Sequence, residues 1–154
     1  MTLVVTILGC GSSAGVPRPA LGWGKCDPNN PKNRRRRCSL LVEQKSAHGT
    51  TRIVIDTSPD LREQLIDAEV DHLDAVFLTH EHADQTHGID DLRSVVMHQR
   101  KRIPTYFNQS TAKDTMARFS YCFISLEGSY YRRFCSAVES KAAKAPASKG
   151  RAAR

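Results

Sequence analysis

The segment His80-Glu81-His82-Ala83-Asp84-Gln85-Thr86-His87 places three imidazoles and two carboxylates within eight residues. His80 and His82 are two residues apart, so their side chains point to the same side while the backbone is extended. Asp84 and His87 can converge on a second position once the chain turns towards a helix. Imidazole nitrogen combined with carboxylate oxygen suits zinc, manganese or iron better than calcium or magnesium. The segment therefore predicts a metal site, for which a dinuclear centre is geometrically feasible.

The alternative is a chance cluster of surface histidines in a polar loop, which is the usual explanation for a single histidine. Here three of the six histidines of the chain lie in eight positions, with a fitting acid among them and Gly88 at the entrance of a predicted helix. This pattern is much narrower than a match at one position, and it favours the metal site.

The elements that must position this segment are predicted to be strands alternating with helices. The apolar run Asp74–Thr79 predicts a buried strand directly before His80. Loops at the carboxyl ends of buried strands are where α/β folds assemble their sites. The sequence predicts further strands at 3–8, 39–43, 52–56, 103–107 and 121–124, and helices at 61–68, 89–98 and about 110–118. This alternation predicts the α/β fold class.

Two connections between these elements have distinct compositions. Residues 46–51 separate two short strands and predict a hairpin. Residues 15–37 contain four prolines and end in the run Arg34–Arg37, which excludes regular structure. A loop of that length inside a compact domain is usually functional or mobile.

The length and composition of the chain limit its class. A chain of 154 residues and 17.1 kDa has the size of one globular domain. No apolar run approaches the roughly 20 residues of a membrane span, and the apolar opening at 3–8 lacks the basic region of a secretory signal. The five cysteines form no C-x-x-C pair, which predicts reduced thiols rather than a disulfide framework or a cysteine zinc site. We therefore expect a cytoplasmic protein without a membrane partner.

The net charge of +7 is concentrated at the C-terminal end. Residues 136–154 hold five Lys/Arg against one acid and contain seven alanines, which predicts too little apolar burial for a fold. We expect one folded domain over residues 1–130 and a disordered basic tail over 131–154. Such a tail could contact nucleic-acid phosphates, but no aromatic residue is interleaved with its charges for base stacking. A nucleic-acid-binding protein is therefore only a lesser alternative.

The segment Thr79–Gly88 resembles the His-x-His-x-Asp-x-x-His-Gly motif of the metallo-β-lactamase-fold hydrolases. Three further stretches, Gly9–Pro17, the arginine-rich approach to Cys38-Ser39, and Ile53–Thr57, resemble the opening of the subgroup that includes the phosphoribosyl cyclic phosphodiesterases. The resemblance implies a sandwich of two β-sheets flanked by helices, built from two similar halves. The chain then corresponds to the N-terminal half of this αββα sandwich.

The resemblance also implies roles for individual residues. In that family two divalent metal ions, zinc or manganese, share a bridging hydroxide. The correspondence puts His80 and His82 on the first metal and Asp84 and His87 on the second, with Asp84 as the catalytic group that helps to position the hydroxide. Asp56 matches the acid at a strand end that orients a ligand histidine.

The implied activity is metal-dependent hydrolysis of the phosphodiesterase type. The expected substrate is a small phosphorylated molecule such as a cyclic phosphate or a nucleotide, and thioester or lactam hydrolysis is a lesser option. Arg34–Arg37 could grip a substrate phosphate, because guanidinium offers a planar fork of donors to phosphate oxygens. A solvated loop, or contacts with acids such as Asp27, is the alternative for this run.

The resemblance covers roughly residues 3–130 and then stops. The second half of the family fold supplies further histidines and a bridging aspartate, whereas the one histidine after Gly88 is His98, which matches no ligand position. The alternative prediction is a truncated or frameshifted fragment that is inactive or impaired alone. A single sheet with helices on one side would also leave an apolar face uncovered, which predicts aggregation or self-association through that face.

Overall fold

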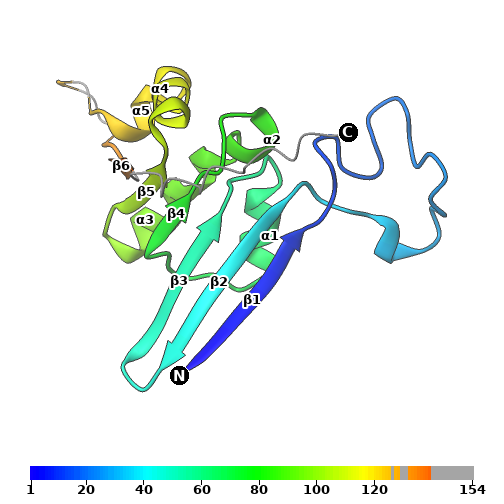
Figure 1. The fold of residues 1–154 in the computed structure, drawn as a ribbon, viewed down its shortest axis with the longest axis horizontal. Helices are drawn as coiled ribbons and strands as arrows, with labels where there is room; N and C mark the ends of the chain where they lie inside the picture. Colours follow the sequence, from blue (N-terminus) through cyan, green and yellow to red (C-terminus); the bar gives the residue numbers. More distant parts are fainter. Residues whose placement is uncertain (126, 129–131, 140–154) are drawn as a thin grey trace, which may run out of the picture.

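The computed structural model describes residues 1–125, 127–128 and 132–139, which form one mixed sheet with helices on one face (Figure 1). The elements in chain order are β1 (Thr2–Gly9), the 3-10 turn η1 (Pro31–Asn33), β2 (Ser39–Ser46), β3 (Gly49–Ile55), α1 (Leu61–Asp67), β4 (Ala75–Phe77), α2 (Ala83–Thr86), the 3-10 turn η2 (Ile89–Asp91), α3 (Leu92–Gln99), β5 (Ile103–Phe107), α4 (Gln109–Arg118), α5 (Ser120–Phe123) and β6 (Cys135–Glu139). The α/β class is confirmed.

The six strands lie in sequence order, and their pairing changes from antiparallel to parallel along the sheet. β1 pairs antiparallel with β2, and β2 forms a hairpin with β3 in which Ser46 lies opposite Gly49. From β3 to β6 every pairing is parallel, because a helical segment or a long connection returns the chain to the same end of the sheet each time. The predicted hairpin is confirmed.

The core lies between the sheet and its helices. The strand pairing places Leu41 opposite Val54 and Val54 beside Val76, and these three side chains are at most 2% exposed. They belong to the same buried cluster as Leu61 and Leu65 of α1. Burial of these alternating strand residues fixes the register, because a slip of one residue would move each of them to the other face.

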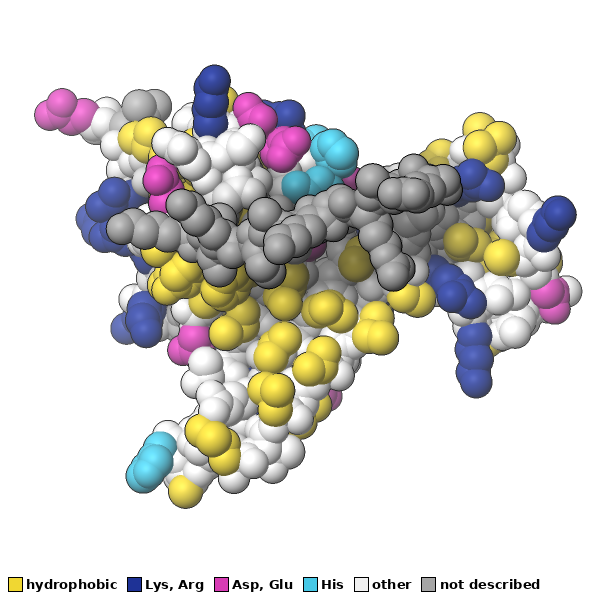
Figure 2. Space-filling view, viewed as in Figure 1, with side chains coloured by type: hydrophobic (Ala, Val, Ile, Leu, Met, Phe, Trp, Pro, Cys, Tyr) yellow, Lys and Arg dark blue, Asp and Glu magenta, His cyan; other side chains and the backbone are white. Residues whose placement is uncertain are grey.

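The opposite face of the sheet is apolar and uncovered in the described part of the chain. Leu3, Val5 and Ile7 of β1 are 67, 56 and 67% exposed. Val5 lies opposite Val42, and Val42 lies opposite Ile53. We call this surface the open face; its members are the outward side chains Leu3, Val5, Ile7, Leu40, Val42, Ile53, Ile55, Phe77 and Tyr106. Figure 2 shows hydrophobic side chains gathered over the strands on this side.

The C-terminal part of the described chain differs from the sequence prediction. The segment 121–124, predicted as a strand, lies largely in the short helix α5, and the strand beside β5 is β6. β6 lies inside the segment expected to be a tail. Its entry is anchored by Phe134 and Cys135, which are 2 and 0% exposed, whereas the prediction rested on the average composition of the alanine-rich end. The ordered sheet therefore includes Glu139, and residues 140–154 of the expected tail lie outside the described residues.

The long segment between β1 and β2 is irregular apart from η1, as the prolines predict. It is fastened by isolated backbone bridges between Gly11 and Arg37 and between Val16 and Arg35. A Cβ at Gly11 would come within 2.7 Å of the Arg36 carbonyl oxygen, so this close approach requires glycine. The bridges place the arginine run beside the carboxyl end of β1.

Within the described residues, no helix is both long and apolar enough to cross a membrane. The cytoplasmic location stays a prediction.

Candidate metal centre

The histidine segment lies at the carboxyl ends of the parallel strands β3 and β4. β4 pairs with β3 through Phe77, and the Asp56 amide donates to the Phe77 carbonyl at 2.8 Å. Leu78 donates to the Tyr106 carbonyl at 2.9 Å and extends the contact with β5. Asp56 and Thr79 are thus held at neighbouring strand ends, directly before His80.

A hydrogen-bonded chain links Asp56 to His80 through Thr79. The Asp56 carboxylate accepts from the Thr79 amide at 2.8 Å and from the Thr79 hydroxyl at 2.8 Å. The same hydroxyl oxygen lies 2.9 Å from Nδ1 of His80. Because its single hydrogen is directed at Asp56, the hydroxyl oxygen accepts from His80 Nδ1–H, which leaves Nε2 with its lone pair. This is the arrangement by which an outer carboxylate prepares a histidine for a metal ion.

Asp56 is buried and has a backbone φ of 63°, in the left-handed region. Burial raises the pKa of Asp56 above its ordinary value of 3.8, and the two hydrogen bonds from Thr79 counteract this effect. The negative charge of Asp84 adds to the rise. An unusual backbone conformation at such a position is a frequent mark of a functional site.

His80 and His82 are brought together. Their ring centroids are 4.7 Å apart and the planes are inclined by 74°. His80 is half-buried and His82 is exposed, so one ring is fixed by the scaffold and the other faces solvent. The segment is still extended at His82, the residue that precedes α2, which is why two side chains two residues apart meet.

Asp84 and His87 lie at the two ends of the short helix α2. Asp84 is in its first turn and half-buried, and His87 is its last cap residue and exposed. The ring of His87 packs edge-on against Phe119 with centroids 5.4 Å apart. Arg118 donates to the Glu81 carbonyl at 2.6 Å. The far side of the segment is thus held by the last residue of α4 and the residue that follows it.

The backbone of the segment is anchored to the turn after β3. Thr57 donates its amide to the Gln85 carbonyl at 2.7 Å, and Gly88 donates to the Thr57 carbonyl at 2.9 Å. A Cβ at Gly88 would overlap the Ser58 carbonyl oxygen, so only glycine fits where α2 meets this turn. The glycine that closes the sequence motif therefore has a packing reason.

The donors have the chemistry that a first-row metal ion takes, but the set is not closed. Within the described residues, no group of three or more His, Cys, Asp or Glu side chains is close enough to hold an ion. Catalytic metal sites use three protein ligands or more with one open position. His80 and His82 lie side by side, whereas His87 is turned to Phe119. The described residues thus bring two histidines together without completing a set of three ligands.

The arginine run divides into two arginines that bind acids and two for which the described residues offer no carboxylate. Arg37 donates to both carboxylate oxygens of Asp60, at 2.6 and 2.9 Å, and Arg36 pairs with Asp67 at 2.7 Å. No carboxylate partner is recorded for Arg34 or Arg35 among the described residues. The acids that bind half of the run are therefore Asp60 and Asp67, not the Asp27 that the sequence suggested.

Arg34 and Arg35 line a small cavity together with Arg36 and Arg37. The cavity measures about 200 Å³ and lies between the backbone of Ala14–Pro19 and the run Arg34–Arg37. The hydrogen bonds of Asp60 raise the pKa of Arg37, and the negative charge of Asp84 adds to the effect. Arg37 is thus close enough to Asp84 for the two charges to interact.

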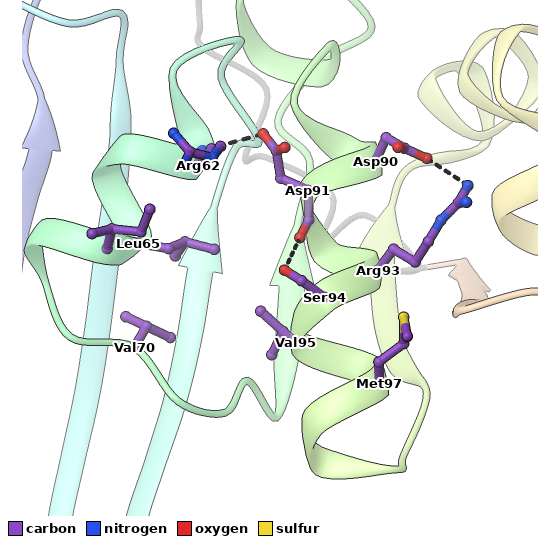
Figure 3. A pocket seen from close by; sticks show the side chains of 10 residues that line it. Arg62, Leu65, Val70, Asp90, Asp91, Arg93, Ser94, Val95 and Met97 are labelled. Atoms are coloured by element: carbon purple, nitrogen blue, oxygen red, sulfur yellow. Dashed lines mark hydrogen bonds and ion pairs between the residues drawn. The ribbon is translucent and has the colours of Figure 1, made fainter.

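Two larger hollows lie away from the histidine segment. One, of about 430 Å³, lies between α1 and α3; Figure 3 shows Leu65, Val70 and Val95 on its sides and the Asp90–Arg93 ion pair, of 2.9 Å, at one end. The other, of about 880 Å³, is a groove whose lining includes five cations and no acid: Arg100, Lys101, Arg102, Arg132 and Arg133. We call it the basic groove. Neither hollow is lined by any residue of His80–His87.

Sequence reasoning located the histidine segment and Asp56 but missed three residues that hold it. Thr79 joins Asp56 to His80, and Arg118 and Phe119 close the far side. The only sequence cue for Thr79 is its place between a buried strand and the first histidine. Arg118 and Phe119 lie more than 30 residues further along the chain, and nothing in their local sequence marks them.

A family model described as "Beta-lactamase superfamily domain" matches residues 51–144. A curated protein of Porphyromonas gingivalis named octanoyltransferase is 38% identical over 117 residues, which cover 76% of this chain and 23% of that protein. The matched part is less than a quarter of that protein.

Two solved structures share the fold. One, described as a new diphosphatase from the PhnP family, is 29% identical with a TM-score of 0.74, over 91% of this chain and 51% of that chain. The other, the metallo-beta-lactamase fold protein YhfI from Bacillus subtilis, is 16% identical with a TM-score of 0.57, over 90% of this chain and 45% of that chain. The chain thus spans about half the length of these structures.

Proposed function

The chain belongs to the β-lactamase superfamily, in its metallo-β-lactamase fold, and from this membership we propose that it forms the N-terminal half of a metal-dependent hydrolase of the phosphodiesterase type. The observation that carries the proposal is the chain from Asp56 through Thr79 to His80, which sets one imidazole beside a second at the sheet edge. A divalent ion such as zinc or manganese, bound at such a site, would supply Lewis acidity and lower the pKa of a water molecule to about 7.

The chain's own residues have separate roles in this proposal. Asp56 and Thr79 orient His80, so that Nε2 faces outward beside His82. Asp84 and His87 would supply the second pair of ligands, and Asp84 would also help to position a water molecule there. Because only part of a ligand set is present in the described residues, the chain alone should be inactive or severely impaired.

The proposed substrate is a small phosphorylated molecule, such as a cyclic phosphate or a nucleotide. This choice is supported by Arg34 and Arg35, which line a cavity beside Arg37 and have no recorded carboxylate partner among the described residues. Guanidinium groups bind phosphate oxygens in a bidentate manner. The likeness to a chain described as a diphosphatase points in the same direction.

Metal binding is the direct test of the site. Cobalt(II) added to the full chain should give a visible absorption band, and its binding should weaken by at least about tenfold in His80→Ala and His82→Ala. The matched control is His98→Ala, an exposed histidine on α3. Equal binding by all three variants would show that the histidine segment is not the site.

Activity decides between the enzyme and the alternative of a non-catalytic fragment. The chain is assayed with zinc or manganese on an aryl phosphodiester, a cyclic nucleotide and a thioester. A second sample is co-expressed with the C-terminal half of the PhnP-family diphosphatase. Turnover of the phosphodiesters that appears or rises on co-expression supports the proposal. A preference for the thioester would contradict the substrate class, and a folded, metal-loaded complex without turnover would favour the non-catalytic fragment.

The basic groove favours nucleic-acid binding as a second candidate function. Its five cations surround the apolar Val96 and Met97, without an aromatic side chain in the lining, so contacts would go to phosphates rather than to bases. The test is the salt dependence of binding to a single-stranded oligonucleotide. Arg100→Ala should lower the slope of log K against log salt by about 0.7, whereas Lys113→Ala on α4 should not. Equal slopes would remove this candidate.

A further inference from the structure

Gln64 on α1 is a polar residue that is 0% exposed. A buried amide costs free energy unless both of its polar ends are bonded. In Gln64 both ends are bonded: the Ser58 hydroxyl donates to Oε1 at 2.9 Å, and Nε2 donates to the Arg37 carbonyl at 2.9 Å. We call this connection from Ser58 through Gln64 to Arg37 the Gln64 bridge. It joins the turn after β3 to the arginine run.

The orientation of the Gln64 amide is fixed by Ser58. The Ser58 hydroxyl accepts from the Asp60 amide at 3.1 Å, and its hydrogen is directed at Oε1 of Gln64. With the amide oxygen facing Ser58, the amide nitrogen faces the Arg37 carbonyl, which can only accept. Ser58 is 0% exposed as well, so water does not compete for this hydrogen bond.

One end of the Gln64 bridge is the turn that holds the histidine segment. Ser58 follows Thr57, whose amide donates to the Gln85 carbonyl at 2.7 Å and whose carbonyl accepts from Gly88 at 2.9 Å. The Thr57 hydroxyl also donates to the Gln85 carbonyl, at 3.2 Å. The turn that binds Gln64 is therefore the same turn that fixes the backbone of the histidine segment.

The other end of the bridge attaches the arginine run to α1. The backbone of Arg35 exchanges two hydrogen bonds of 2.9 Å with Val16, but both residues belong to the same irregular segment. That contact shapes the cavity without attaching it to a helix. The attachment is made at Arg37, whose carbonyl accepts from Gln64 and whose guanidinium pairs with Asp60.

The bridge is tightly packed against the end of β1. A Cβ at Gly9 would lie 2.6 Å from Nε2 of Gln64 and 2.0 Å from the Arg37 carbonyl oxygen. Only glycine therefore leaves room for this hydrogen bond, which holds α1 and the arginine run at one separation.

We propose that Gln64 is a positioning residue, which fixes the cavity lined by Arg34 and Arg35 at one distance from the histidine segment. Gln64 is too deeply buried to touch a ligand, and it acts through Arg37. A fully bonded buried amide makes its surroundings rigid, whereas an apolar side chain of the same length would pack without setting a direction. The inference rests on the proposed function, because it takes this cavity as the phosphate site.

The experiment measures the binding of inorganic phosphate to the full chain by isothermal titration calorimetry, without divalent ions. Because the basic groove also offers cations, Arg35→Ala identifies the part of the binding that depends on the cavity. Gln64→Met keeps the length of the side chain and removes both hydrogen bonds. We expect it to weaken the Arg35-dependent binding by about three- to tenfold.

The matched control is Gln99→Met. Gln99 also joins a helix to a loop, since it accepts from the Leu73 amide at 3.0 Å and donates to the Leu73 carbonyl at 3.2 Å. It does not line the cavity of the arginine run. This variant should keep the Arg35-dependent binding of the wild type.

A double-mutant cycle separates positioning from a general loss of stability. In the Arg35→Ala background, Gln64→Met should have no further effect on phosphate affinity, because the cavity through which it acts is already impaired. A loss of stability alone would not couple the two positions. Circular dichroism shows which variants are folded.

Each outcome has a defined meaning. Weaker phosphate binding in folded Gln64→Met, together with coupling to Arg35 and an unchanged Gln99→Met, supports the proposal. Wild-type affinity in folded Gln64→Met, or an equal loss with and without Arg35, would overturn it. If Gln64→Met does not fold, Ser58→Ala takes its place, because it removes only the hydroxyl that orients the amide, and an unchanged affinity there would overturn the proposal.

The wild type tests the proposed function itself. A wild-type chain without Arg35-dependent phosphate binding would contradict the proposed substrate class, and the positioning role would be wrong with it. Wild-type binding that Gln64→Met leaves unchanged would contradict the positioning role alone.

Discussion

At the scale of single residues, the hydroxyl of Thr79 decides how His80 is presented. Thr79→Val removes the hydroxyl that bonds the buried Asp56 carboxylate, and the carboxylate keeps only the bond from the Thr79 amide. We expect a loss of about 1–3 kcal/mol in the free energy of unfolding, measured by urea denaturation. Thr79→Ser keeps the hydroxyl and is the matched control. A valine variant as stable as the wild type would show that the hydroxyl bond to Asp56 contributes nothing to stability.

The cysteines differ in reactivity at the same scale. All five are free thiols; Cys10 and Cys38 are exposed, whereas burial raises the pKa of both Cys122 and Cys135 to about 12. Since the thiolate is the nucleophile, iodoacetamide should label the exposed pair and spare the buried pair of the folded chain, as read by peptide mass spectrometry. A raised thiol pKa favours the neutral form, so the folded chain should lose stability as the pH rises above the ordinary thiol value of 9.0.

Labelling of Cys122 at the same rate as Cys10 in native buffer would contradict the burial of α5. Full labelling of all five thiols in urea is the control for their accessibility once the chain is unfolded.

At the scale of elements, the ion pair between Arg37 and Asp60 ties the arginine loop to the start of α1. The stability that this tether contributes should depend on pH. The hydrogen bonds from Arg37 lower the pKa of Asp60 below its ordinary value of 3.8. The ionised pair therefore contributes stability above pH 3.8, and this contribution is lost as the pH falls through the lowered pKa. Asp60→Asn should cost about 1–2 kcal/mol near neutral pH and much less well below pH 3.8, measured by urea unfolding.

The matched control for this tether is Asp67→Asn, which breaks the more exposed pair with Arg36. We expect an effect of about 0–1 kcal/mol at either pH. If the difference between Asp60→Asn and the wild type did not change with pH, the ion pair would not be the source of its stability.

Elements built from local patterns were predictable, whereas those defined by distant partners were not. Short β-branched runs flanked by turns predicted β1–β4, and the spacing of the histidines placed the candidate site at a strand end. β6 was not predicted, because only Phe134 and Cys135 at its start are buried apolar residues and the sequence that follows is rich in alanine. The segment 121–124 has apolar residues that suit a strand or a helix. In the structure it directly follows α4 and lies largely in the helix α5. The division of Arg34–Arg37 depends on acids in α1 and its cap, which sequence spacing does not reveal.

At the scale of the whole molecule, β6 belongs to the folded unit. Phe134 is buried beneath the guanidinium of Arg93, 5.3 Å from the ring centroid, and its carbonyl accepts from the Ile103 amide at 3.1 Å. A chain truncated after Arg133 should lose its cooperative thermal transition, because removal of a single buried aromatic side chain already costs about 3–5 kcal/mol. The readout is circular dichroism during heating.

Truncation after Glu139 is the matched control and should melt close to the full chain, as expected for a tail that buries little apolar surface. If both truncations melted alike, β6 would contribute nothing to the fold, and the original boundary near residue 130 would stand.

Arg118 and Phe119 contact Glu81 and His87, and we call these two residues the clamp. Their position in the chain has a consequence for protein synthesis. The chain leaves the ribosome from its N-terminus, and domains begin to fold as they emerge. β1–β4 and the histidines can therefore be out and paired while the residues that hold Glu81 and His87 from the far side, 32 to 37 positions later, are still being made. The nascent protein passes through a stage with its sheet edge formed and its histidines released. A chaperone or an early metal ion would meet the segment in that stage, before the clamp fixes it.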